Sequence, residues 1–163
     1  MKKQGFTLIE LMVVIVIMGI LAAVAVPKLF GMIAKSKASE VGPAAGTYVK
    51  LQDAYAAERN AAGGWKLIGY TKPASNNFSY SDEAIDEDKT TALDDLSNDL
   101  GWKALNLVAL NDCQANACKW NIVLNKGDAG GQIKYAACQD SDASPLTPNF
   151  TAISTPGETC TAQ

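Results

Sequence analysis

The sequence predicts an α+β protein with one long, bent N-terminal helix, whose apolar front half protrudes and whose back half packs on a small antiparallel β-sheet. Three observations predict this class: an apolar run that starts at Phe6, a following segment with apolar residues at helical spacing, and two strand-like runs joined by a glycine-rich connection. The chain of 163 residues, 48% hydrophobic and 19% charged, suffices for one compact domain plus an appendage.

The apolar run is long enough to cross a membrane. A helix from Phe6 to Val26 would measure roughly 30 Å, the thickness of a bilayer's hydrocarbon core. Lys2 and Lys3 precede it. The positive-inside rule therefore places the N-terminus in the cytoplasm and the part after Pro27 across the membrane.

Glu10 is out of place in such a run. A charge at mid-helix weakens membrane insertion by about 2.5 to 3.5 kcal/mol. A secretory signal cleaved at Ala23–Ala25 gains nothing from this carboxylate, and neither does a plain anchor. Because the sequence has no Lys or Arg between Gln4 and Lys28, a partner for Glu10 must come from elsewhere.

The stretch KKQG, followed by FTLIE, resembles the prepilin cleavage motif of type IV pilins and of the pilin-like subunits of type II secretion systems. The resemblance implies the pilin fold and a leader of residues 1–5. It implies that a membrane peptidase cuts after Gly5 and methylates the new amine of Phe6. It also implies that Glu10 of an incoming subunit meets this amine on its neighbour and sets the stagger of the filament. Removing one partner of such a buried pair costs about 3 to 5 kcal/mol.

The same resemblance implies the partners. We expect a homopolymeric filament, a prepilin peptidase, an inner-membrane platform protein and an assembly ATPase, with the subunit in the inner membrane before assembly and in a surface fibre afterwards. The sequence itself argues against catalysis, since without His it cannot build a Ser-His-Asp or Cys-His site. With a net charge of −3 and no basic stretch, we expect no nucleic acid as a partner.

Gly19 and Pro27 fall where this family carries helix-weakening residues. Glycine lowers helix stability by about 1 kcal/mol against alanine, and proline removes a backbone hydrogen bond. We expect the segment between them to lose helicity on assembly; the alternative is a simple kink at Pro27.

Past Pro27 the helix continues with one apolar stripe, and polar residues such as Gln52 and Asp53 avoid it. We expect Gly42-Pro43 to bend this half and Gly63-Gly64 to end it, giving a helix from about Thr7 to about Ala62. The stripe consists of Val41, Ala44, Tyr48, Leu51 and Tyr55.

The globular domain, residues 28–163, supplies the sheet. Residues 119–124 and 132–138 predict an antiparallel hairpin, and residues 65–70 and 104–110 are weaker strand candidates. Leu93, Leu96 and Leu100 followed by Gly101 suggest a short amphipathic helix. Within a variable region of about 63–103, the polar residues 76–99 predict a surface loop. The sheet and a C-terminal loop then occupy about 104–163.

The four cysteines are even in number and lie in the part expected outside, which favours disulfides over a zinc site. Three pairings exist. We favour Cys113 with Cys118, which closes a tight loop, and Cys138 with Cys160, which ties the last strand to the tail. In pilins a late disulfide bounds such a tail loop.

Other features receive their ordinary interpretation. Trp65, Trp102 and Trp120 are expected in the core. The sequons at Asn77 and Asn149 are treated as coincidence. The acidic residues of 82–99 are typical of a solvated surface, so we expect no cofactor and no metal. The alternative is that some of these carboxylates bind calcium.

The sequence thus predicts the major subunit of a type IV pilus, a surface fibre for adhesion or motility. Two alternatives stand beside it. One is the major pseudopilin of a type II secretion system, which usually lacks the late disulfide loop. The other is a minor tip pilin that holds a ligand in the loops of residues 76–99 or 138–160.

Overall fold

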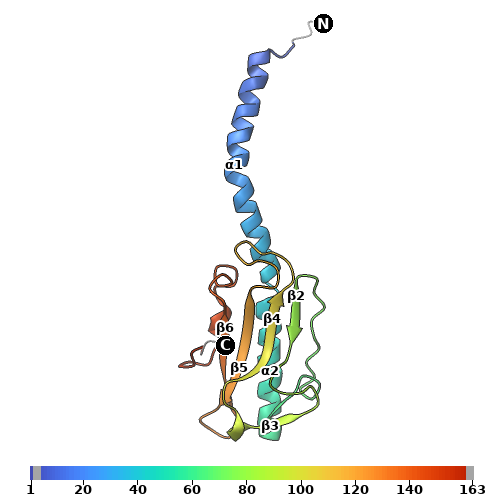
Figure 1. Ribbon diagram of the computed structural model, residues 1–163, viewed down its shortest axis with the longest axis vertical. Coiled ribbons are helices and arrows are strands. Elements are labelled where there is room, and N and C mark those ends of the chain that lie inside the picture. Colours follow the sequence, from blue (N-terminus) through green and yellow to red (C-terminus); the bar gives the residue numbers. More distant parts are fainter. Residues whose placement is uncertain (2–4, 161–163) are drawn as a thin grey trace.

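The protein is a long helical rod whose far half is covered by a globular domain (Figure 1). The computed structural model describes Met1 and residues 5–160. Helix α1 spans Leu8–Ala38 and α2 spans Val41–Arg59. Of the residues in α1, the buried ones are Ala34 and Ala38, so nearly the whole of this helix stands clear of the domain. The predicted long, bent helix with a protruding apolar half is confirmed.

The bend lies at Ser39 and Glu40, between the two helices, rather than at Gly42-Pro43. The cause is still Pro43, which has no N–H to donate to the carbonyl of Ser39 and whose ring crowds that carbonyl. The Ser39 N–H donates to the Lys35 oxygen at 3.0 Å, so the hydrogen-bond pattern of α1 continues up to the bend.

Helix α2 ends earlier than the glycine pair predicts. Asn60 takes the left-handed conformation, with φ of 52°, and its N–H donates to the Ala56 oxygen at 2.8 Å. Asparagine tolerates this helix-ending conformation better than most residues. Ala61–Gly63 is therefore free to form strand β1.

The domain contains two antiparallel sheets. The larger has the order β2-β4-β5-β6, and the smaller pairs β1 with β3 at the far end of α2 (Figure 1). The remaining bounds are Phe78–Ser81 for β2, Thr90–Ala92 for β3, Asp99–Asn106 for β4, Lys119–Lys126 for β5 and Ile133–Gln139 for β6. Short 3₁₀ turns are η1, Leu93–Asp95, and η2, Phe150–Ile153. The predicted hairpin of β5 and β6 is confirmed.

Three weaker predictions are wrong or shifted. Residues 65–69 form a turn, because β1 and β3 pair with each other and leave no strand partner for them. The strand predicted at 104–110 is β4, which starts at Asp99 and ends at Asn106. The helix predicted from Leu93 to Leu100 shrinks to η1, and residues 76–99 contain β2 and β3 as well as loops.

The buried face of α2 differs by one position in each turn from the predicted stripe. Val41 and Tyr48 are buried as expected, while Ala44, Leu51 and Tyr55 are only half-buried. The deeper positions are Ala45, Gln52 and Ala56. Gln52, predicted to face solvent, is 0% exposed because its amide bonds the Gly63 backbone and the Tyr48 hydroxyl.

The three tryptophans lie in the core, and each indole N–H finds an acceptor. Trp65 donates to the Gly101 oxygen at 2.9 Å, Trp102 to the Tyr70 hydroxyl at 2.9 Å, and Trp120 to the Thr147 hydroxyl at 2.7 Å. Buried tryptophan needs such partners. These bonds tie the sheet to the turn of residues 65–69 and to the C-terminal loop.

Candidate assembly surface

Among the described residues, all of the exposed large apolar side chains except Met1, Phe6, Leu67 and Leu107 lie on α1. Its large side chains from Leu8 to Ile33 are exposed throughout, and Phe6 ahead of the helix is 87% exposed. Within Met1 and residues 5–160, one helix, counted across the bend from Leu8 to Arg59, is long and apolar enough to cross a membrane. Apolar area of this extent is unstable in water, so it requires a lipid bilayer or other protein as its surroundings.

The start of α1 is held by Thr7 and Glu10. The Thr7 N–H and hydroxyl donate to Glu10 Oε2 at 2.8 and 2.5 Å, and the Glu10 N–H donates back to Thr7 Oγ1 at 3.4 Å. This reciprocal pair is a capping box, which satisfies N–H groups that the first turn of a helix leaves unpaired. The capping box was not predicted from the sequence, although the three-residue spacing of Thr7 and Glu10 is its usual signal.

Glu10 thus has a partner inside its own subunit. The carboxylate is exposed and lies one turn from the end of the helix, on a surface otherwise made of apolar side chains. It is the acidic residue of the first turn, where the helix dipole favours negative charge. An exposed carboxylate in this position can accept further hydrogen bonds from a cation placed beside it.

Gly5 and Phe6 precede the helix in irregular, exposed backbone. Lys2, Lys3 and Gln4, the rest of the predicted leader, lie outside the described residues. The Gly5–Phe6 bond therefore lies outside regular secondary structure.

Gly19 and Pro27 both lie within the continuous helix α1. A methyl group added at Gly19 would meet no atom within 4 Å, so nothing in the single subunit requires glycine there. The predicted loss of helicity concerns the assembled state and stays a prediction.

The C-terminal tail is fastened to the sheet at several points. The structure contains the disulfides Cys113–Cys118 and Cys138–Cys160, the pairing that the sequence favours. The second joins the end of β6 to the tail. Further along β6, the Thr155 N–H donates to the Tyr135 oxygen at 2.9 Å, and the Tyr135 N–H donates to Thr155 Oγ1 at 3.0 Å. The Ala137 N–H donates to Ser154 Oγ at 2.9 Å, so the tail covers the outer edge of β6.

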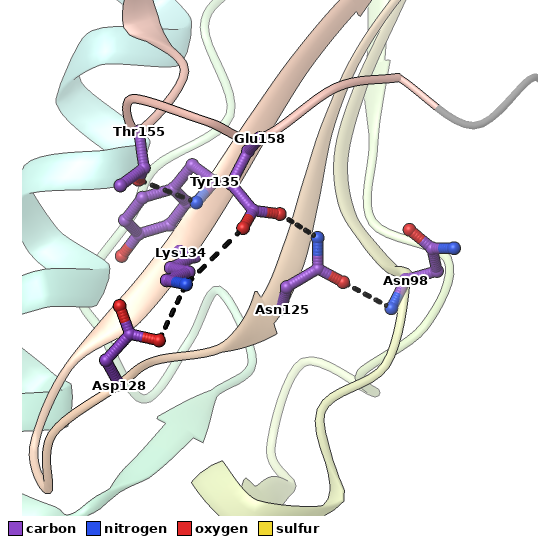
Figure 2. A network of polar contacts seen from close by, with 7 residues as sticks. All are labelled: Asn98, Asn125, Asp128, Lys134, Tyr135, Thr155 and Glu158. Atoms are coloured by element: carbon purple, nitrogen blue, oxygen red, sulfur yellow. Dashed lines mark hydrogen bonds and ion pairs between the residues drawn. The ribbon is translucent and has the colours of Figure 1, made fainter.

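A polar network continues this fastening across the sheet (Figure 2). Glu158 of the tail accepts from Asn125 Nδ2 at 2.8 Å and lies 3.7 Å from Lys134 Nζ. Lys134 also pairs with Asp128 at 2.7 Å, and this carboxylate is the main cause that raises the pKa of Lys134. Asn125 in turn accepts from the Asn98 N–H at 2.7 Å. The network therefore links the tail to β5, β6 and the turn before β4.

A second polar cluster fastens the loop before β2 to the bend of the helix. The Ser75 hydroxyl donates to Glu40, and the Tyr80 hydroxyl donates to Glu40 Oε1 at 3.1 Å. Ser75 also accepts from the N–H groups of Asn77 and Phe78. Burial raises the pKa of Tyr80, and the neighbouring Glu40 raises it further. Tyr80 therefore stays neutral and acts as a donor at this site.

The acidic residues of 82–99 do not gather around one point. Glu83 pairs with Lys103, Asp86 with Lys89 and Asp94 with Lys126. Over Met1 and residues 5–160, no group of three His, Cys, Asp or Glu side chains is placed to share a metal ion. The calcium alternative stays untested.

Known proteins resemble this chain both in its N-terminal segment and over most of its length. Residues 1–26 match the family described as the prokaryotic N-terminal methylation motif. A type IV major fimbrial protein FimA of Dichelobacter nodosus strain VCS1703A is 36% identical over 132 residues, which cover 80% of this chain and 72% of the relative. A fimbrial protein of Dichelobacter nodosus is 33% identical over 136 residues, again 80% of this chain and 72% of the relative.

A third relative extends the comparison to another organism. The type IV major pilin protein PilA of Myxococcus xanthus is 35% identical over 80 residues, which cover 48% of this chain and 36% of the relative. No solved structure matches this chain.

Proposed function

This chain belongs to the type IV pilin family, and we propose that its mature form begins at Phe6 and polymerises through α1 into a fibre on the cell surface. As a pilin it is a structural subunit. The observation that carries the proposal is the exposure of every large apolar side chain of α1 from Leu8 to Ile33. Packing against copies of itself would bury this surface without a second kind of partner.

Before assembly we place α1 in the inner membrane, in a single pass with the N-terminus in the cytoplasm. Support comes from the length and apolar character of the helix and from Lys2 and Lys3 in the sequence. A prepilin peptidase would cut between Gly5 and Phe6 and methylate the new amine. An inner-membrane platform protein and an assembly ATPase would supply the mechanical work, since nothing in this chain resembles an ATP-binding motif.

Cleavage after Gly5 would create a positively charged amine on Phe6. This amine could pair with Glu10, which has no Lys or Arg near it in the sequence. We assign Glu10 two successive partners: Thr7 in the single subunit, and the Phe6 amine of a neighbour in the fibre. The capping box survives cleavage because its atoms belong to Thr7 and Glu10. The charge pair would form among apolar helices, where a displaced subunit would leave the carboxylate buried without its cation, so the pair would set the stagger.

The relatives reported above are named as major pilins or fimbrial proteins. These names favour a major pilin over the pseudopilin and the minor tip subunit. Adhesion and motility are the uses we propose for the fibre, because both need an abundant, exposed polymer.

The first experiment determines the intact mass and the N-terminal sequence of the exported protein. We expect a chain that starts at Phe6 with a methylated amine. A start at Val26 would show cleavage of an ordinary secretory signal and would contradict the proposal.

The second experiment separates charge from capping. Glu10→Ala and Glu10→Gln should both leave the subunit in the membrane and reduce sheared fibre strongly, because glutamine can still accept from Thr7 but carries no charge. Thr7→Val removes the cap and keeps the charge, so it should assemble. Normal fibre from Glu10→Gln would refute the charge pair. The abundance of this chain in wild-type fibres distinguishes a major subunit from a tip subunit, which would give only a trace.

A further inference from the structure

At the bend of the helical rod, an apolar groove of about 420 Å³ opens between the helices and the C-terminal loop. We call it the neck groove. Its walls include Ala38, Ser39 and Gly42 from the helices and Leu146, Phe150 and Ile153 from the C-terminal loop. A methyl group added at Gly42 would meet no atom within 4 Å, so the helix side of the groove is open. The groove therefore has room for a side chain from outside.

The helix face above the groove is basic. Lys35 precedes Ala38 and Ser39 by three and four residues, which places it on the same face of α1, and Lys28 lies two turns further up. Met32 lies between the two lysines and is exposed. Over Met1 and residues 5–160, neither Lys28 nor Lys35 forms an ion pair. The groove thus combines apolar walls with two uncompensated positive charges.

The opposite end of the domain carries the complementary features. Leu67 is 41% exposed at the tip of the turn of residues 65–69. The Lys66 N–H donates to the Glu87 oxygen at 3.0 Å, which holds this turn beside an acidic segment. Glu87 and Asp88 are exposed and, within the described part of the chain, form no ion pair. We call Leu67, Glu87 and Asp88 the distal knob.

The distal knob is joined to the segment that leads into β3, because the Gly64 N–H donates to the Lys89 oxygen at 2.8 Å, so it lies further from α1 than the neck groove does. Figure 1 shows β3, which follows the acidic segment directly, at the end away from α1, whereas the bend lies where α1 enters the domain. A contact between different surfaces of identical copies extends into a helical polymer when its rotation does not close a ring. The arrangement fits contact along the axis of a fibre.

We propose that the neck groove of one subunit receives the distal knob of a second copy, with Leu67 against the apolar walls and Glu87 and Asp88 beside Lys28 and Lys35. This inference rests on the proposed function, because it needs a polymer of this chain. The charge of the incoming segment distinguishes between two possible occupants of the neck groove. The exposed part of α1 from a neighbour is the other apolar candidate, but it has no carboxylate between Glu10 and Glu40, whereas, among the described residues, the distal knob offers two unpaired carboxylates beside the one exposed lysine of its turn, Lys66.

A charge-reversal series tests the pairing in fibres of the full chain. Lys35→Glu and Glu87→Lys should each lower the yield of sheared fibre by about tenfold, since like charges in an interface are repulsive. The double variant should recover most of the yield. Lys50→Glu, an exposed lysine on α2 away from both surfaces, is the matched control and should assemble normally. Membrane levels of each subunit show whether it folds. Normal yield from both single variants would overturn the inference.

Crosslinking identifies the occupant. With the native disulfides kept, Leu67→Cys together with Asn149→Cys, at the rim of the groove, should give a ladder of linked subunits when fibres are run without reducing agent. A ladder from Met32→Cys with Asn149→Cys in its place would show α1 as the occupant and overturn the inference. Abundant fibres with no Leu67→Cys ladder would overturn this contact and leave the proposed function standing. Wild-type fibres that lack this chain would overturn both.

Discussion

Gln52, at the centre of α2, makes both hydrogen bonds of the Gly63 backbone: Nε2 donates to the Gly63 oxygen at 2.9 Å, and the Gly63 N–H donates to Oε1 at 3.1 Å. The same Nε2 donates to the Tyr48 hydroxyl at 3.1 Å. A side-chain amide thus substitutes for a neighbouring strand beside β1. It also fixes the point where the chain leaves the helix.

The first prediction follows from this contact. Gln52→Leu keeps the volume of the side chain but leaves the Gly63 N–H and oxygen without partners, at a cost of about 1 to 3 kcal/mol for each buried group. We expect the free energy of unfolding of the full chain in detergent to fall accordingly, measured by denaturant titration. Lys50→Leu, two residues away and exposed, is the control. An unchanged midpoint for Gln52→Leu would show that water satisfies these groups.

The second prediction concerns the tail. Replacing Cys138 and Cys160 by serine removes a link that closes a loop of 22 residues, worth about 3 kcal/mol in the chain-entropy account. We expect proteolysis within residues 140–160 to become faster while the hairpin of β5 and β6 stays intact. Mass spectrometry of the fragments locates the cuts. The Cys113–Cys118 disulfide closes a loop of only five residues. Replacing these two cysteines by serine should therefore change the protection of the tail much less.

Gly101 supports the third prediction. It lies at the bulge where β4 and β5 shift register, and a methyl group there would come within 2.1 Å of Leu124 Cδ1 and 2.2 Å of the Tyr48 hydroxyl. Gly101→Ala should therefore lower the free energy of unfolding by about 1 to 3 kcal/mol, as overpacked cores do. Gly46→Ala, with open space on α2, is the control and should be neutral or stabilising. Equal midpoints for the two variants would contradict the prediction.

The fourth prediction tests the weak segment of α1. Pro27→Ala restores a backbone donor inside the helix and should raise the stability of this segment in the single subunit by about 3 kcal/mol. If the segment must unwind in the fibre, Pro27→Ala should assemble more slowly or into fibres with altered symmetry, which electron microscopy would resolve. Gly31→Ala, in the same helix but outside the segment, is the comparison. Identical fibres from the wild type, Pro27→Ala and Gly31→Ala would favour a simple kink at Pro27 over unwinding.

The elements that the sequence predicts well carry their signals locally. The periodic apolar pattern of the helix, the glycine-rich turn between β5 and β6 and the spacing of the cysteines each depend on nearby residues. Strands β1 and β3 have three residues each and exist only because they pair with one another, so no local pattern marks them. Trp65 and Tyr70 read as strand residues but pack as an aromatic pair, with ring centres 4.7 Å apart, around a turn.

The candidate assembly surface also contains both locally marked residues and residues that only the fold brings together. Gly5, Phe6 and Glu10 are marked by a contiguous motif, whereas the neck groove joins residues of the helical bend to residues more than a hundred positions later. The prediction that Gln52 faces solvent is wrong because a polar side chain is exposed on average, and its partner Gly63 lies eleven residues away in the sequence. Burial of a glutamine depends on such a partner, which composition and periodicity do not reveal.

The tail along β6 has a consequence for the assembly that we propose. An open strand at the edge of a sheet invites pairing with the same strand of another molecule, and so leads to aggregation. Here Ser154 and Thr155 occupy the backbone groups of β6 that would accept such a strand. The opposite edge, β2, has only four residues. In the polymer that we propose, this protection of the sheet edges would disfavour amorphous association through the sheets and so favour ordered growth through the helices.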